Sequence, residues 1–183
     1  MALPDDYTDT LAKLGEAFAA YETATGVRAV LVGGAAAAVL TDGEFMSADF
    51  DVLAANDIAF TEAMEGAGFE HDKLAGHGDG GWFHPSQPRY VVEQVSGRYF
   101  DGRGDKGRCL QMRVREGSTV VLPAVEDIIA DRLGQHEVSQ GDASMLEQAR
   151  ALYTIAQDLD VKYLVRRILE ESGNPALLGL SRD

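Results

Sequence analysis

The chain has 183 residues, and 45% of them are hydrophobic, which suits one medium domain, or one domain with a helical extension, with a real core. Its formal net charge is −14, and so acidic a surface repels a phosphodiester backbone at long range. General nucleic-acid binding is therefore disfavoured, whereas binding of a compact nucleotide together with its own divalent cation, or of a basic protein, is not.

The N-terminus is acidic and lacks the positive and apolar regions of a signal peptide, and no stretch is long and apolar enough to cross a bilayer. We therefore expect a cytoplasmic protein without a membrane partner. The single cysteine, Cys109, excludes an internal disulfide framework and fits a reducing compartment.

The first third of the chain reads as helix, strand, Gly-Gly turn, short helix, loop and strand. Apolar residues three and four apart in TLAKLGEAFAAYETATG predict an amphipathic helix that ends at Gly26. The apolar run at 29–32 is typical of a buried strand and leads directly into Gly33-Gly34. The segment AAAAVL predicts a short helix, and residues 48–54, ADFDVLA, predict a second strand.

The middle third is punctuated by glycine. We expect a helix capped by Asn56 or Asp57, and a largely irregular segment in HDKLAGHGDGGWFHPSQP. A valine-rich strand is predicted at 89–97. A polar loop follows it, and then a hairpin that turns at 116–117.

From Ala124 onward the pattern is helical. Three segments carry apolar residues at helical spacing, Asp160 is placed to cap the last of them, and GNPALLGLSRD reads as a loosely attached tail. Because strands concentrate early and helices late, we predict an α+β fold. Its mixed sheet, flanked by helices, occupies residues 1–122, and a helical region packed on that core occupies 123–183.

Two carboxylates carry the strongest chemical signal. Asp49 and Asp51 are two apart on a predicted strand, so both point to one face, with Phe50 and Val52 on the other. Two adjacent carboxylates repel one another unless a cation lies between them, and oxygen ligands suit Mg²⁺ or Mn²⁺. A solvated pair without metal is the simpler reading of such a motif taken alone.

The Gly33-Gly34 turn supplies a complementary feature. Two glycines between a strand and a helix let backbone N–H groups approach a phosphate without interference from a Cβ. The pattern lacks the G-x-G-x-x-G of a dinucleotide-binding fold and the Gly-Lys-Ser/Thr of a P-loop. A metal beside a helix N-terminus is an arrangement that suits phosphoryl transfer.

The block VLVGGAAAAVLTDGEFMSADFDVLA resembles the signature of the nucleotidyltransferase (polymerase-beta-like) superfamily, and within it the AbiEii-type toxin nucleotidyltransferases. LPAVEDIIADRLGQ is similar to the helix that follows the sheet in that family, and LDVKYLVRRILEE to its closing helices. The likeness extends from about Val30 to Glu171. It implies a nucleotidyltransferase-like sheet flanked by helices, Mg²⁺, and transfer of a nucleoside monophosphate from a nucleoside triphosphate.

The resemblance also implies roles for individual residues. Gly33, Gly34 and Ser47 would bind the triphosphate, and Asp49 and Asp51 would be catalytic metal ligands.

The superfamily has a third acid on a later strand, and Glu93 is the best-placed candidate; the alternative is an edge-strand glutamate facing solvent. Arg132, at the position of a family lysine, would hold triphosphate oxygens with Asp131. The alternative for Asp127 and Asp131, one turn apart, is a solvated helix face.

The acceptor implied by the toxin resemblance is an RNA end or a protein hydroxyl, with a cognate antitoxin as a possible partner. Phe45 and Met46 stand where such toxins carry a basic residue, which favours the alternative of an inactive nucleotide- or protein-binding module.

Three further features remain open. An RNA acceptor would require the basic residues between 98 and 115 to gather into a strip. The histidines at 71, 77 and 84 match no zinc pattern. Trp82 and Phe83 suit either base stacking or core packing.

Overall fold

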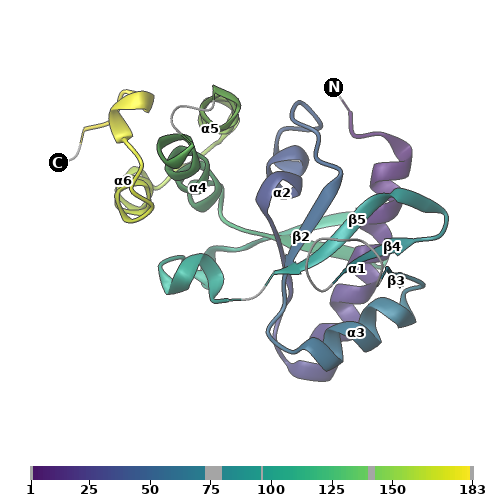
Figure 1. The fold of residues 1–183 in the computed structure, drawn as a ribbon. Helices are drawn as coiled ribbons and strands as arrows, with labels where there is room; N and C mark the ends of the chain where they lie inside the picture. The colour runs from purple at the N-terminus through teal and green to yellow at the C-terminus, as the bar shows by residue number, and fades with distance from the viewer. Residues whose placement is uncertain (1, 73–79, 96, 140–142, 182–183) are drawn as a thin grey trace. The chain divides into compact units, whose positions relative to one another are not determined.

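The computed structural model describes residues 2–72, 80–95, 97–139 and 143–181 (Figure 1). The chain divides into two compact units. The sheet unit consists of Met1–Arg98 and Cys109–Leu122, and the helical unit consists of Tyr99–Arg108 and Pro123–Asp183. The ten residues Tyr99–Arg108 therefore belong with the helices, although they lie between the two segments of the sheet unit in sequence.

The sheet unit is built on a five-stranded mixed sheet with strand order β1-β2-β5-β4-β3. Its strands are β1 (Val30–Val32), β2 (Asp49–Leu53), β3 (Glu70–Asp72), β4 (Gly81–His84) and β5 (Gln87–Val95). β2 and β5 are parallel, and the other neighbours are antiparallel. β6 (Leu110–Arg115) and β7 (Ser118–Leu122) form a separate two-stranded hairpin, which confirms the predicted turn at 116–117.

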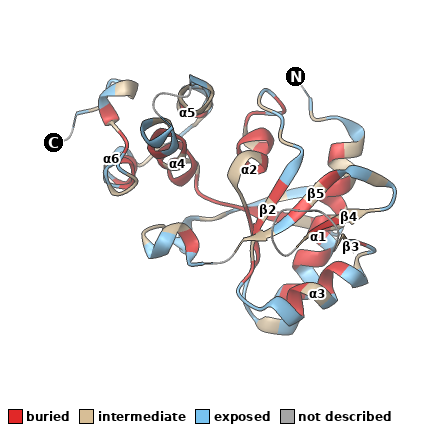
Figure 2. Cartoon of the chain, viewed as in Figure 1, coloured by how far each residue is buried: buried red, intermediate tan, exposed pale blue. Residues whose placement is uncertain are grey.

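The helices of the sheet unit are α1 (Asp5–Thr25), α2 (Gly33–Leu40) and α3 (Asp57–Gly66). α1 ends at Gly26 in the left-handed conformation, as predicted, and buries an aromatic side chain near each end. The Tyr7 ring centroid lies 4.8 Å from that of Phe50, and the Tyr21 hydroxyl accepts hydrogen bonds from two backbone N–H groups after β2. One face of β2 is thereby fixed against α1, and both elements carry buried residues (Figure 2). Along β2, buried residues alternate with less buried ones.

Capping resolves one open alternative. The Asn56 side chain accepts a hydrogen bond of 3.0 Å from the backbone N–H of Ala59, so Asn56, not Asp57, caps α3.

The Gly- and Pro-rich segment at 71–88 contains more strand than predicted, since β3 and β4 lie within it or at its edge. Trp82 pairs with Val92 of β5 in an antiparallel register and is buried. The pattern hides this strand because its stability comes from pairing with a distant neighbour rather than from local propensity.

The helical unit contains the 3₁₀ turns η1 (Tyr99–Gly102), η2 (Lys106–Arg108) and η3 (Pro175–Leu178), and the helices α4 (Val125–Val138), α5 (Ala143–Ile155) and α6 (Val161–Glu170). The Asp160 carboxylate accepts from the Tyr163 N–H at 3.0 Å, which confirms its predicted capping role. None of the described helices is long and apolar enough to span a membrane.

The tail is more firmly packed than expected. Pro175 is buried, and a Cβ added to Gly173 would lie 3.0 Å from side-chain atoms of both Ile168 and Leu133. The prediction of a loose extension is wrong, because the close approach of a glycine lets the chain turn back onto α4 and α6.

Candidate active site

The turn between β1 and α2 lies directly against a carboxylate. Gly33 has φ +66°, and a Cβ added to it would lie 2.2 Å from Oδ2 of Asp51. No larger residue fits without displacing Asp51, and the backbone conformation itself favours glycine. The sequence therefore uses glycine here to bring the start of a helix next to an acidic side chain.

The second glycine makes a matching approach to the loop before β2. A Cβ added to Gly34 would lie 3.0 Å from the Ser47 hydroxyl oxygen, and this hydroxyl donates a hydrogen bond of 3.0 Å to the Asp49 carbonyl. The structure thus brings Gly33, Gly34, Ser47, Asp49 and Asp51 together, although the glycines and the carboxylates are well separated in sequence.

The carboxylates lie on the face of β2 opposite the aromatic core. Asp49 is exposed and Asp51 is half-buried, whereas Phe50 and Val52 between and after them are fully buried. This alternation is what the spacing of the two acids predicts. The aromatic packing on one face therefore fixes the direction of both carboxylates on the other.

The pairing of β2 with β5 places Glu93 next to Asp51. The parallel register of β2 and β5 pairs these two residues and pairs Asp49 with Val91. Neighbouring strands are about 4.8 Å apart, and side chains in register share a face. Glu93 is exposed, so the face that carries the aspartates also carries a third acid.

These residues suit a hard cation only together with other ligands. Among the described residues, no group of three or more His, Cys, Asp or Glu side chains is arranged to hold a metal ion. Mg²⁺ commonly takes one or two carboxylates and completes its shell with water and substrate phosphates. Asp49 and Asp51 are the residues that would hold it in this way.

The N-terminus of α2 offers donors on the same side. Its N-cap residue, Val32, has no side-chain acceptor, and the first turn contains no acidic residue. The first backbone N–H groups of a helix lack intrahelical partners and carry a partial positive charge, so they favour an anion. Two carboxylates and helix N–H groups that favour an anion thus lie at adjacent positions.

Asp131 and Arg132, the predicted triphosphate contacts on α4, have partners within the helical unit. The Arg132 guanidinium is buried and lies 2.6 Å from Oδ2 of Asp131 and 3.5 Å from the Met145 sulfur. Gln135 also donates to Asp131. Their binding to a triphosphate stays a prediction.

Asp127 is not on the solvated helix face offered as its alternative reading, because its side chain is fully buried. It accepts hydrogen bonds from the hydroxyls of Tyr99 and Tyr163, each at 2.9 Å, and from Nε of Arg167 at 2.6 Å. Burial raises the pKa of Tyr163 to about 12, so this phenol stays protonated as a donor. Asp127 is therefore a structural acceptor.

The basic residues between 98 and 115 are divided between the two compact units. Several are paired locally with acids: Arg103 with Asp101 and Glu171, Arg108 with Asp160, and Arg115 with Asp9. The first two belong to the helical unit and Arg115 to the sheet unit. These pairs weaken the case for a large RNA acceptor.

The histidine and aromatic candidates have different neighbours in the structure. His71 packs edge-on against Trp82 with centroids 4.7 Å apart, and Nδ1 of His84 lies 2.7 Å from the Ser86 hydroxyl. His77 lies outside the described residues. Trp82 is a core residue, whereas Phe83 is half-buried and shares a face with Val91.

No protein-family model and no curated protein matches the sequence. Solved structures do match. An antigenic nucleotidyltransferase-like protein from Paracoccidioides brasiliensis superposes with a TM-score of 0.62 at 13% identity, over 92% of this chain and 88% of that one.

A second protein, ANT(2″)-Ia, matches in two structures. Its crystal structure in complex with adenylyl-2″-tobramycin gives a TM-score of 0.54 at 15% identity, over 89% of this chain and 98% of that one. Its solution structure, described as that of an antibiotic-resistance factor, gives 0.56 at 13% identity, over 90% and 92%. The chain thus has a nucleotidyltransferase-like fold.

Proposed function

We propose that the chain is a metal-dependent nucleotidyltransferase that moves a nucleoside monophosphate from a nucleoside triphosphate to an acceptor hydroxyl. The observation that carries this proposal is the contact between the Gly33-Gly34 turn and the β2 carboxylates. Glycine is required there by both backbone conformation and space, which holds a phosphate-binding turn against a cation-binding pair.

In this proposal, Asp49 and Asp51 hold Mg²⁺ or Mn²⁺, which when bound neutralises charge on the triphosphate. The Ser47 hydroxyl and the first N–H groups of α2 bind phosphate oxygens. Glu93 accepts the proton of the acceptor hydroxyl, whose oxygen bonds to the α-phosphorus. The bond from that phosphorus to the bridging oxygen breaks, and pyrophosphate leaves.

The resemblance, the net charge and the structural comparison each bear on the class of acceptor. The resemblance to AbiEii-type toxins favours an RNA end or a protein hydroxyl, with an antitoxin as partner. The net charge of −14 and the paired arginines disfavour a large RNA. The tobramycin adduct of ANT(2″)-Ia adds a small hydroxylated compound as a third acceptor class to test.

The competing proposal is a nucleotidyltransferase-fold binding module without turnover. Phe45 and Met46 support it, because they stand where the related toxins carry a basic residue. A module of this kind would bind nucleotide or protein but release no pyrophosphate.

Calorimetry with each nucleoside triphosphate and Mg²⁺ separates these proposals. We expect binding that requires the metal and is lost in Asp49→Ala and Asp51→Ala. Glu70→Ala is the matched control, because Glu70 is an exposed strand acid at the far edge of the same sheet. Binding unaffected by either aspartate substitution would remove the site assignment.

Pyrophosphate release with RNA, protein and tobramycin acceptors then tests turnover. Glu93→Gln should keep nucleotide binding and lower the rate by roughly 10²–10⁴-fold, the usual contribution of a general base. Metal-dependent binding without pyrophosphate release from any acceptor would favour the inactive module.

A further inference from the structure

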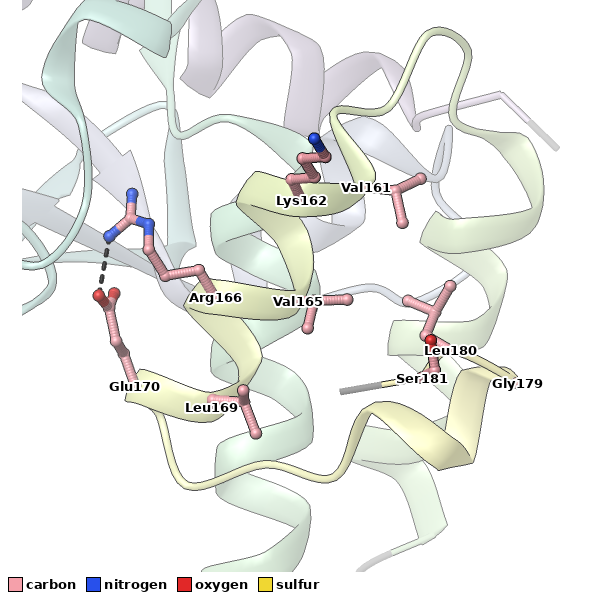
Figure 3. A pocket seen from close by; sticks show the side chains of 9 residues that line it. All are labelled: Val161, Lys162, Val165, Arg166, Leu169, Glu170, Gly179, Leu180 and Ser181. Carbon is pink, nitrogen blue, oxygen red and sulfur yellow. Dashed lines mark hydrogen bonds and ion pairs between the residues drawn. The ribbon is translucent and has the colours of Figure 1, made fainter. Parts of the chain in front are cut away.

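The helical unit has a groove of about 750 Å³ along α6, where Val165 points toward Leu180 (Figure 3). Every described residue that lines this groove belongs to the helical unit, and none of them is a candidate site residue. The contacts that bear on the proposed site lie in the sheet unit, at the turn of residues 54–56 between β2 and α3.

The Gln94 side chain ties β5 to the turn that follows β2. Its amide nitrogen donates one hydrogen bond to the Ala54 carbonyl at 2.9 Å and another to Oδ1 of Asp57 at 2.8 Å. A primary amide nitrogen carries two N–H groups, so both of them have acceptors. Gln94 pairs with Val52, and its side chain thus reaches past the end of β2 in the direction in which both strands run.

A parallel pair such as β2 and β5 is not aligned by a tight turn between its two strands. β2 ends at Leu53, and β5 begins only at Gln87. β5 also pairs with β4, but that register shifts between Phe83 and His84, close to the connection of these two strands. Side-chain contacts between β5 and the end of β2 therefore contribute to the alignment.

The alignment decides where Glu93 lies. In the observed register, Glu93 is opposite Asp51. Side chains alternate along a strand, so a shift of one residue would turn Glu93 to the face that packs on α1. A shift of two residues would move it about 7 Å along β2, opposite Asp49 or Leu53. The third acid is thus beside Asp51 only in the observed alignment.

We propose that Gln94 is a positioning residue for Glu93: its two hydrogen bonds hold β5 in the register that places Glu93 beside Asp51. This inference rests on the proposed function, in which Glu93 accepts the proton of the acceptor hydroxyl. Gln94 points to the opposite face of the sheet, because neighbouring residues on a strand alternate between faces. Its effect on the reaction therefore passes through the position of the Glu93 carboxylate.

Gln94→Met keeps a long side chain and removes both donors. We expect kcat for pyrophosphate release to fall on the order of 10²-fold, the cost of displacing a catalytic group by about 1 Å. The KM for the nucleoside triphosphate should change less than about twofold, because Gly33, Gly34 and Ser47 do not lie on β5. Gln94→Lys, which restores N–H donors on a long side chain, should recover most of the rate.

Tyr21→Phe is the matched control, because it removes two hydrogen bonds that join the same turn to α1 and not to β5. The Tyr21 hydroxyl oxygen accepts from the backbone N–H groups of Ala55 and Asn56, at 3.0 and 3.1 Å. Both variants should melt at lower temperature than wild type, but only Gln94→Met should lower kcat. Equal losses of kcat in the two variants would mean that Gln94 contributes to stability alone.

Disulfide trapping reads the register without turnover. In a Cys109→Ser background, Asp51→Cys with Glu93→Cys places two thiols in register, at a strand spacing of about 4.8 Å that suits a disulfide. We expect this pair to oxidise readily, and Asp51→Cys with Val91→Cys to oxidise slowly. Adding Gln94→Met should lower the first rate and raise the second.

Trapping that Gln94→Met leaves unchanged would overturn the inference, whether or not the chain turns over. Absence of pyrophosphate release from wild type with every acceptor would instead remove the proposed function. A changed trapping pattern would in that case still assign the register of β5 to Gln94, so the two failures are distinguishable.

Discussion

Asp51 in the sheet unit and Asp127 in the helical unit are both acidic residues beside apolar ones in sequence, and they lie in very different surroundings. Asp127 has no exposed surface, and two tyrosines and an arginine donate to it. Asp51 is half-buried, is in register with a second acid, Glu93, and lies against a glycine turn.

This difference distinguishes a carboxylate that stabilises the fold, Asp127, from one that is a candidate for ligand binding, Asp51. A buried carboxylate whose oxygens accept hydrogen bonds from protein donors stabilises the fold. Asp51 and Glu93 are in register on one sheet face, and two like charges at such positions repel one another. Position beside apolar residues does not distinguish the two, whereas burial and the charge of the residue in register do.

The largest effect should come from Asp127→Ala. It leaves the fully buried Arg167 without one of its three acidic partners, and loss of one member of a buried ion pair costs about 3–5 kcal/mol of unfolding free energy. Urea unfolding followed by circular dichroism measures it. Asp101→Ala, which removes the 82% exposed partner of Arg103, should cost less than about 1 kcal/mol. Similar losses in both variants would contradict the architectural role.

The next largest effect should come from Gly33→Ala. The new Cβ would collide with Asp51 in a left-handed backbone conformation, so we expect nucleotide binding to be lost and stability to fall by about 1–3 kcal/mol. Gly117→Ala is the matched control: its φ is +76°, but nothing lies within 4 Å of the new Cβ. Calorimetry and thermal unfolding should show about 1 kcal/mol of strain there and unchanged nucleotide binding.

A smaller effect concerns acid stability in the helical unit. The hydrogen bond from the Tyr163 N–H, together with Arg108, holds the pKa of Asp160 below its usual range. A carboxyl with a lowered pKa in the folded state stabilises the fold above its unfolded pKa of about 4, and this contribution is lost as pH falls through the folded pKa. Melting temperatures between pH 6 and pH 2.5 should therefore decline less in Asp160→Ala than in wild type. Parallel curves would exclude this contribution.

The smallest effect has the opposite sign. In metal-free buffer, Glu93→Gln should raise the unfolding free energy by a few tenths of a kcal/mol, because it removes the like charge in register with Asp51. Glu70→Gln, whose register partner is Phe83, should not. Loss of stability in Glu93→Gln would mean that the carboxylate has a donor and resembles Asp127 instead.

Local sequence patterns predicted most of the features that depend on residues close together in the chain. The alternation at Asp49–Leu53, the stop at Gly26 and the cap at Asp160 are short-range features, and each is found in the structure. The Gly33-Gly34 turn was predicted from the residues as well, but its distances to Asp51 and Ser47 depend on how β1 and β2 pair.

Features that depend on distant partners were missed. β4 is a strand because β5 pairs with it, not because its own residues favour one. Asp127 is buried because Arg167, forty positions later, is held on the neighbouring helix. The α4 segment gives no sign of that pairing, and the signal in the α6 segment is an arginine at an otherwise buried position.

The assignment of residues 99–108 to the helical unit has a topological consequence. The chain passes between the units after Arg98, Arg108 and Leu122, so three covalent connections join them instead of one. A protein cut at 122 would keep Tyr99 and Arg103 but lose the Asp127 and Glu171 that bind them. Neither unit corresponds to a continuous stretch of gene, so exchange of one unit between proteins by a single recombination event would disrupt both.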